Sequence, residues 1–439
     1  MNDQISLEQI KKFKEVYDSD KMNKVIENAI TKNGVEKACI SRDVIIENQP
    51  VFNIELPESK RYDQQDSHKC WIFSGLNLIK YDIAKNLNMN VADLELSNSY
   101  IAFYDKLEKS NNTYENIINL ANVDYDYIHK EKIIASCVNE GGYWEWFEAI
   151  IDKYGVLPYS YNPDAVESTN FLRVQCIYTE KVKKDILKLI ELKRNGADIE
   201  LLRENKNKFL QENYILLCKL IGEPLTEFNY EYKDKSGEYH RIDGLTPIEF
   251  KNRFLKLKLE DFVTIGNFPM YNKEFNKVYR LKYEGNVRQA YARYLNLPIE
   301  DLKELTIKQL KDGIPVYMGA HIMKFRDTKS GVLDTRLYDY ADTLNFETLS
   351  KEEALNLRDI CMHHAMSFVG VNLVDGVPQR WKIEDSYGDK AKVKGCYVMN
   401  DNFFSEFVLS ITVDKKYLSA EQLECLKQEP IEFAGDEPF

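Results

Sequence analysis

Long apolar runs are missing from this chain of 439 residues. One of the longest, residues 407–413, is already interrupted by Ser410 and Thr412. A membrane-spanning helix needs about 20 consecutive apolar residues, so we expect no membrane span. The N-terminal residues also lack the apolar core of a secretory signal and instead fit an amphipathic helix capped by Ser6. We therefore expect a cytoplasmic protein.

Closely spaced cysteine pairs are missing as well. The eight cysteines are scattered along the chain, and none forms a CxxC pair. A disulfide framework is typical of small secreted domains rather than of a chain of this length. A zinc site needs close Cys and His pairs, and the adjacent His363 and His364 do not share one face of a helix. We expect no metal and mostly reduced, buried thiols, of which one or two carry chemistry.

The chain has no excess of positive charge. Its 71 acidic and 59 basic residues give a net charge of −12, with a pI near 5.3. Binding to a phosphate backbone needs clustered lysine and arginine. We therefore do not expect a nucleic-acid partner, although this balance leaves room for a local basic face.

Five segments differ in their patterns, and together they predict an α+β protein with more than one subdomain. Residues 1–61 form a helical and then extended lead-in, and residues 62–180 are mostly helical. Residues 181–260 contain long, charged amphipathic helices, which we interpret as a helical insertion. Residues 261–415 contain short apolar strands separated by turns, and residues 416–439 form a C-terminal arm.

The strongest functional signal lies where a polar loop meets a predicted helix over residues 70–86. Cys70 stands at the start of this helix, where the positive end of the helix dipole lowers a thiol pKa and favours the nucleophilic thiolate. Gln64, six residues earlier, could donate a hydrogen bond to an oxyanion that forms near Cys70. Taken alone, a cysteine at a helix start is more often a buried structural thiol.

Two sites in the β-rich segment complete the pattern. His364 begins an apolar segment and could act as a general base. Asp385 follows another such segment and could hold the imidazole in one tautomer. A lone histidine usually has no such role, and an Asp before a turn is usually a turn residue. The order Gln, Cys-Trp, His-Ala and Asx-Ser-aromatic-Gly is far more specific than any one of its parts.

These motifs resemble those of the bleomycin hydrolase and aminopeptidase C family of papain-like cysteine peptidases. The nucleophile motif of that family, a Gln followed by Cys-Trp, matches Gln64 and residues 70–71. Its His-Ala-Met motif matches residues 364–366, and its Glu-Asn-Ser-Trp-Gly motif matches residues 384–388. Further matches, such as TKNG near the start, extend the resemblance over almost the whole chain.

Three positions depart from the family pattern. Asp385 replaces the usual Asn, Tyr387 replaces the Trp that shields it, and His68 replaces a Gly shortly before the nucleophile. A carboxylate at position 385 would stabilise the imidazolium and widen the pH range of a Cys–His ion pair. One alternative is therefore a catalytically impaired papain-like scaffold that binds peptides.

The resemblance implies a papain-like fold of two lobes with an added helical insertion, assembled into a homohexamer through the insertion of residues 181–260 and the N-terminal helix. It implies a cysteine aminopeptidase that acts on peptide substrates through a thioester and needs no cofactor. The implied catalytic residues are Cys70, His364 and Asp385, with Gln64 at the oxyanion. In this family the C-terminal carboxylate, here that of Phe439, binds the amine of the substrate. Because the arm looks a few residues short, endopeptidase activity is a second alternative.

Overall fold

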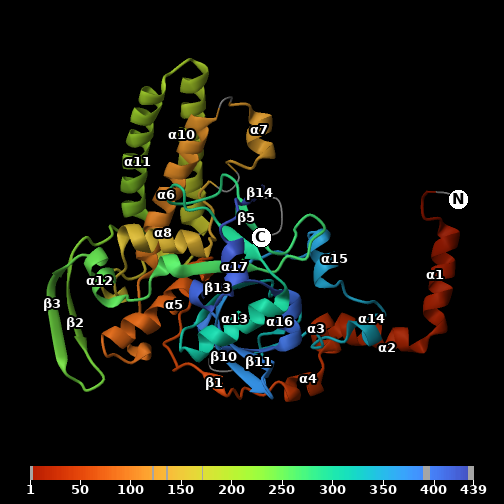
Figure 1. Ribbon diagram of the computed structural model, residues 1–439. Helices are drawn as coiled ribbons and strands as arrows, with labels where there is room; N and C mark the ends of the chain where they lie inside the picture. The colour runs from red at the N-terminus through yellow and green to blue at the C-terminus, as the bar shows by residue number, and fades with distance from the viewer. Residues whose placement is uncertain (1–2, 121–122, 135–136, 171, 389–395, 434–439) are drawn as a thin grey trace.

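The computed structural model describes residues 3–120, 123–134, 137–170, 172–388 and 396–433. The described residues of the first part of the chain are mostly helical and include one short strand, β1 (Ile54–Glu55). Figure 1 shows α1 standing apart from the rest of the molecule. The helices of this part are α1 (Leu7–Ser19), α2 (Lys21–Asn33), α3 (Val35–Cys39), α4 (Arg42–Glu47), α5 (Cys70–Asn86), α6 (Asn98–Asn119), α7 (Tyr125–Lys130), α8 (Trp144–Tyr154) and α9 (Val166–Thr169).

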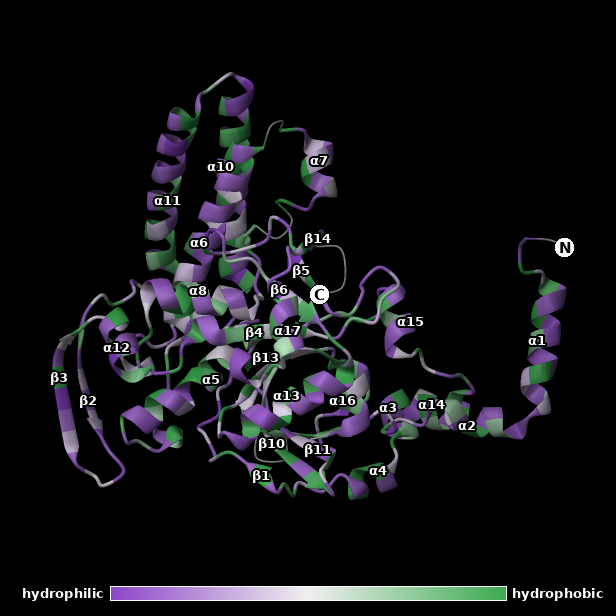
Figure 2. Cartoon of the chain, viewed as in Figure 1, coloured by the Kyte–Doolittle hydropathy of each residue, from purple (hydrophilic) through white to green (hydrophobic). Residues whose placement is uncertain are grey.

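Two long helices follow, α10 (Leu172–Arg194) and α11 (Ile199–Ile221). They pack against each other and against α6, and the pair extends away from the body of the molecule (Figure 1). Figure 2 shows that both helices carry mixed hydrophobic and hydrophilic residues. Their buried side chains, among them Tyr178, Leu189 and Leu217, join Phe103 and Tyr114 of α6 in a second hydrophobic core.

Residues 228–245 correct our interpretation of 181–260 as a helical insertion. They form a two-stranded antiparallel hairpin of β2 (Phe228–Lys233) and β3 (Tyr239–Leu245). Phe228 and Tyr230 are buried while the residues after each of them are exposed, which is the two-residue period of a strand. A short helix, α12 (Pro247–Phe254), follows the hairpin.

The remaining strands form one large sheet. Among the described residues it has 12 strands, in the order β14-β5-β6-β4-β13-β7-β10-β11-β12-β9-β8, with β1 paired to β10. The strands are β4 (Phe262–Gly266), β5 (Lys277–Leu281), β6 (Arg293–Asn296), β7 (Val316–Ala320), β8 (Arg326–Asp327), β9 (Val332–Leu333), β10 (His364–Val374), β11 (Val377–Glu384), β12 (Cys396–Asn400), β13 (Val408–Asp414) and β14 (Ile431–Phe433). The helices of this part are α13 (Ile299–Lys311), α14 (Tyr340–Leu344), α15 (Lys351–Asn356), α16 (Asp401–Phe407) and α17 (Ala420–Cys425).

Helix α5 joins the helical part to the sheet. It begins at Cys70 and ends at Asn86, as the apolar pattern of residues 70–86 predicts. It packs against α6 and α8 and also against β7 and β10. Because β10 begins with His364, this packing brings the start of α5 to the start of β10. In the described residues, no helix is long and apolar enough to cross a membrane.

Candidate active site

The loop before Cys70 holds the thiol at the first residue of α5. Gln65 and His68 adopt left-handed backbone conformations, with φ of 50° and 55°. Glycine adopts this conformation most easily, so His68 occupies a position that favours glycine. The loop is tied to the helical part by Lys69, whose buried ammonium donates hydrogen bonds to Asn98 Oδ1 (3.0 Å) and to the Ser168 carbonyl (2.9 Å).

His364 lies at the first position of β10, where its backbone is paired with Ala320 of β7. Its side chain is buried, and its Nε2 lies 2.8 Å from Asp385 Oδ1. The other ring nitrogen, Nδ1, is left for Cys70, with which the His364 side chain also forms a hydrogen bond. The structure thus brings together three residues that lie far apart in the sequence.

Asp385 directly follows β11 and is buried. Its Oδ1 accepts a second hydrogen bond from the Ser386 N–H (2.7 Å), which fixes the carboxylate toward the imidazole. Within the described chain, its buried Oδ2 has no hydrogen-bond partner. Tyr387 stacks on His364, with ring centroids 5.6 Å apart and an angle of 17° between the rings. Tyr387 therefore covers the His364 ring on one face.

The electrostatics of this group favour a charged Cys–His pair. Burial raises the pKa of Cys70, but the charge of His364 and hydrogen bonds from His364 and the Ala365 N–H lower it below the ordinary thiol value. Burial lowers the pKa of His364, but the Cys70 thiolate and the Asp385 carboxylate together raise it above the ordinary imidazole value. Each group thus favours the charged form of the other, which is the electrostatic arrangement of a thiolate–imidazolium ion pair.

Gln64 is buried beside this pair. Its Oε1 accepts a hydrogen bond from Ser386 Oγ (2.9 Å), and its backbone N–H donates to the Ser386 carbonyl (2.6 Å). Its side chain also forms a hydrogen bond with Tyr387. Because Ser386 holds the amide oxygen, the amide nitrogen of Gln64 is the group that can donate into the pocket that it shares with Cys70.

Two cavities meet at Cys70 and His364. The smaller has a volume of about 320 Å³, and its walls include Trp71, Gly142 and Glu284. The larger has a volume of about 670 Å³, and its walls include Gln64 and Arg326. A peptide bond placed at Cys70 would therefore have room for a chain on both sides.

Gly142 forms part of the wall of the smaller cavity, where it lies against an aromatic ring. A Cβ atom at Gly142 would come within 2.6 Å of the Trp71 ring, so a larger residue does not fit without a shift of the ring. The neighbouring backbone is held by Lys109, whose ammonium donates to the carbonyls of Asn139 and Gly141, each at 2.8 Å. No function was predicted for this wall, although the adjacent Gly141 and Gly142 interrupt a mostly helical pattern in the sequence.

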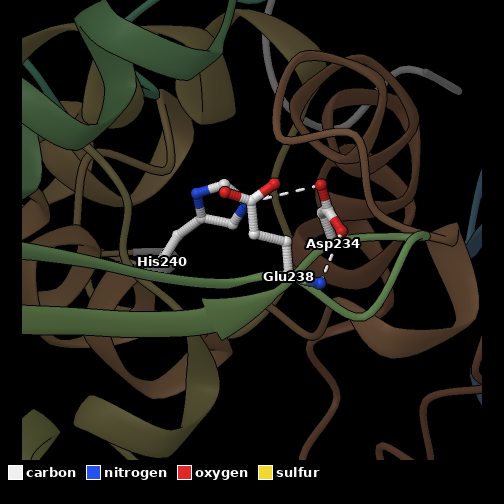
Figure 3. Close-up of side chains that lie close together, drawn as sticks. All are labelled: Asp234, Glu238 and His240. Atoms are coloured by element: carbon white, nitrogen blue, oxygen red, sulfur yellow. Dashed lines mark hydrogen bonds and ion pairs between the residues drawn. The ribbon is translucent and has the colours of Figure 1, made fainter.

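Phe439 lies outside the described residues. A group with metal-ligand geometry is found at the hairpin of β2 and β3, where Asp234, Glu238 and His240 lie close together (Figure 3). However, Asp234 Oδ1 already accepts hydrogen bonds from the N–H groups of Ser236 and Glu238, so this carboxylate serves to close the turn. The group lines neither cavity at Cys70.

Comparisons with known proteins cover the whole chain. The model of the Peptidase C1-like family matches residues 4–439. Aminopeptidase G of Lactobacillus delbrueckii subsp. lactis is 35% identical over 437 residues, which cover 99% of this chain and 99% of the relative. Aminopeptidase C of Streptococcus thermophilus is 34% identical over 426 residues, covering 96% and 95%. The crystal structure of PepW from Lactobacillus rhamnosis HN001 superposes with a TM-score of 0.96 at 33% identity, covering 100% of this chain and 99% of that chain.

Proposed function

Because this chain belongs to the Peptidase C1-like family, we propose that it is a cysteine aminopeptidase that removes residues from the N-termini of peptides. Relatives named aminopeptidase G and aminopeptidase C match it over nearly the full length of both chains. The observation that carries the proposal is the arrangement of Cys70, His364 and Asp385 at the junction of two cavities. The motifs at residues 364–366 and 384–388 further support a bleomycin hydrolase type of enzyme.

The reaction begins with the ion pair. The Cys70 thiolate attacks the carbonyl carbon of the scissile bond, and the carbonyl oxygen becomes an oxyanion. The Gln64 amide and the backbone N–H of Cys70, at the positive end of α5, donate hydrogen bonds to this oxyanion. The imidazolium of His364 then gives its proton to the leaving amine as the C–N bond breaks, and a thioester on Cys70 remains.

A water molecule completes the cycle. The neutral imidazole of His364 takes a proton from water, whose oxygen attacks the thioester and releases the amino acid. The thiolate and imidazolium are thereby restored. Asp385 orients the ring through its 2.8 Å contact with Nε2 and stabilises the imidazolium with its charge. His364 therefore carries out both proton transfers in this scheme, to the leaving amine and from water.

We propose that the C-terminal carboxylate of Phe439 binds the free amine of the substrate. The arm leaves the sheet close to the smaller cavity, because Phe433 of β14 is paired with Leu281 of β5. Glu284, three residues after Leu281, lines that cavity. The six residues after Phe433 can span up to about 20 Å when extended. A buried ammonium–carboxylate contact would favour free amines over blocked ones.

This proposal predicts a strong preference for free amines that depends on the arm. We expect a free-amine peptide to be cleaved at least about tenfold faster than its N-acetylated form, because the acetylated form cannot make a charge-assisted hydrogen bond. A variant that ends after Ala434 should lose this preference. The preference of the wild type and that of the truncated variant are each measured as the ratio of kcat/KM for the free-amine peptide to kcat/KM for its N-acetylated form. Equal cleavage of both peptides by the wild type would reject the aminopeptidase and point to an endopeptidase.

We also propose a homohexamer, with α1 as one of its contacts. Helix α1 has no buried residue, and its apolar side chains Leu7, Ile10 and Phe13 are exposed. An isolated helix of this length is only marginally stable in water, so a second copy of the chain is the expected surface for it.

We also propose a cytoplasmic location for this protein. It is supported by the eight cysteines, all of which are free.

A further inference from the structure

The larger cavity at Cys70 contains a cationic side chain that the reaction scheme leaves unused. Arg326 is half-buried on the short strand β8 and lines this cavity together with Gln64 and Tyr387. Among the described residues that line this cavity, it is the one Lys or Arg. If the part of a substrate that follows the scissile bond occupied the larger cavity, it would lie close to the positive charge of this guanidinium.

Asp327, next to Arg326 in the sequence, and Glu140, in the wall of the same cavity, each have other partners. In the part of the chain that the structure describes, the Arg326 guanidinium makes no ion pair or hydrogen bond. The neighbouring Asp327 accepts the backbone N–H groups of Lys329 (3.2 Å) and Ser330 (2.8 Å) in a turn. Glu140, which also lines the larger cavity, forms an ion pair with Lys106. The guanidinium therefore retains its capacity for a bidentate carboxylate.

The backbone of Arg326 is held in place from two sides. Phe325, just before it, adopts a left-handed conformation with φ of 50°, and its buried ring contacts Tyr338 and Phe407. The Tyr338 hydroxyl donates a hydrogen bond of 2.8 Å to the Arg326 carbonyl. Neither contact uses the Arg326 side chain. A substitution of the side chain can thus leave this segment intact, and the guanidinium is presented from an ordered backbone.

The two cavities differ in charge on either side of Cys70. In the smaller one, the Lys109 ammonium is already paired with buried Asp105 at 2.8 Å, and Glu284 is part of the wall, while Glu140 lines both cavities. The larger one carries Arg326. A peptide has an ammonium at one end and a carboxylate at the other. It is therefore favoured in one direction, with its first residue in the smaller cavity and its remainder toward Arg326.

We propose that Arg326 binds the C-terminal carboxylate of short peptides, so that the substrate class is peptides of a few residues with a free carboxyl end. The inference rests on the proposed aminopeptidase function and adds the length and the C-terminal chemistry of its substrates. Arg326 is a specificity-determining residue in this reaction. It takes no part in bond breaking.

The test compares peptides of two to five residues, each as the free acid and as the C-terminal amide, with one N-terminal residue throughout. We expect kcat/KM to be about 10- to 100-fold higher for the acid at the length that reaches Arg326, as for a charge-assisted hydrogen bond. The ratio of kcat/KM for the free acid to kcat/KM for the amide should fall toward one for the longest peptide. It should also fall as salt is raised, because the contact is half-exposed.

Variants of Arg326 and of the nearby Lys324 show whether the Arg326 guanidinium itself causes the preference for the free acid. Arg326→Gln should bring the ratio of acid to amide close to one, mainly by raising KM for the acid. Arg326→Lys should retain part of the preference, since the charge stays and the bidentate geometry is lost. Lys324→Gln is the matched control, because Lys324 forms an ion pair with Asp359 and does not line the cavity. It removes one positive charge from the same segment and should keep the wild-type ratio.

Activity on an amino-acid p-nitroanilide provides the reference, since this substrate has no carboxylate. We expect Lys324→Gln to cleave it as the wild type does, and the far-ultraviolet circular dichroism spectrum and unfolding midpoint of Arg326→Gln report whether that variant is folded. A wild-type ratio near one at every length, or an unchanged ratio in Arg326→Gln, would overturn the inference while leaving the aminopeptidase proposal standing. A wild type that cleaves neither the anilide nor any peptide would instead reject the aminopeptidase proposal.

Discussion

Helices α5 and α1 have comparable lengths but opposite surroundings. Helix α5 has 17 residues, of which twelve are buried, and it packs against other helices on one side and the sheet on another. Helix α1 has 13 residues, none of which is buried, and it stands apart from the rest of the molecule (Figure 1). Figure 2 shows that α1 nevertheless carries hydrophobic residues among its hydrophilic ones.

One chain forms the catalytic site by itself, whereas the apolar face of α1 would need a second surface to be buried. The catalytic group around Cys70 is assembled entirely from one chain, because the buried faces of α5 position it against β10. The large apolar side chains of α1 stay exposed in that chain, although their burial would contribute roughly 25 cal/mol per Å². Changes in the first region should therefore affect turnover, and changes in the second should affect assembly.

The largest expected effect is that of Cys70→Ala. We expect kcat for a free-amine peptide to fall by about 10⁴-fold or more, because no thiolate remains to form the thioester. Alkylation by iodoacetamide, followed by peptide mapping, should modify Cys70 fastest in the wild type. Cys176→Ser and Cys361→Ser, which change exposed thiols, are the controls and should keep wild-type turnover. Wild-type turnover in Cys70→Ala would overturn the proposed function altogether.

A smaller effect is expected when the partner of His364 is changed. Asp385→Ala should lower kcat by about 10²-fold, since no side chain then accepts the hydrogen bond of the His364 ring. Asp385→Asn should be milder, because the Asn amide oxygen still accepts from the ring N–H. The raised pKa of His364 depends in part on the Asp385 charge. Removing this charge lowers that pKa, so the imidazolium is lost at a lower pH.

The pH–rate profile measures this second effect. In Asp385→Asn the alkaline limb should move to lower pH, because activity needs imidazolium together with thiolate. The far-ultraviolet circular dichroism spectrum and the unfolding midpoint report whether each variant keeps its fold. If the alkaline limb of Asp385→Asn coincides with that of the wild type, the carboxylate does not stabilise the His364 imidazolium in solution.

The smallest effect on turnover is expected from changes in α1. Ile10→Asp combined with Phe13→Asp places charge on its apolar face and should shift the native mass below about six times 51.4 kDa. Lys11→Asp, on the same helix, is the charge-matched control. Light scattering coupled to size exclusion measures the mass, and kcat/KM per active site should stay within about twofold of the wild type. A wild-type protein that is monomeric at micromolar concentration would rule out the hexamer.

The candidate site was predicted from the sequence to different extents in its different parts. The helix start at Cys70 was predicted correctly, because an apolar pattern that follows a polar loop is a local signal. The grouping of Cys70 with His364 and Asp385 rested on the order of motifs, and the family that this order suggested is confirmed. The papain-like fold is confirmed with it.

Other features of the structure could not be predicted from the sequence. The hairpin of β2 and β3 follows the long helix α11 and precedes the short helix α12, and the two-residue period of its strands is hard to recognise in a charged, turn-rich segment. Arg326 carried no signal at all, since it belongs to no motif. Its importance depends on the cavity that it lines, and that cavity is formed by residues from several distant segments.

The sequence alone determined the chemistry of each part: a thiol at a helix start, an imidazole at a strand start and a carboxylate after a strand. These are local properties, because propensities, caps and turns depend on neighbouring residues. The tertiary structure decided which of these parts meet, how far apart their atoms lie, and which charges face a shared cavity. Those properties arise from the packing of α5 against the sheet, where burial and long-range contacts outweigh local preference.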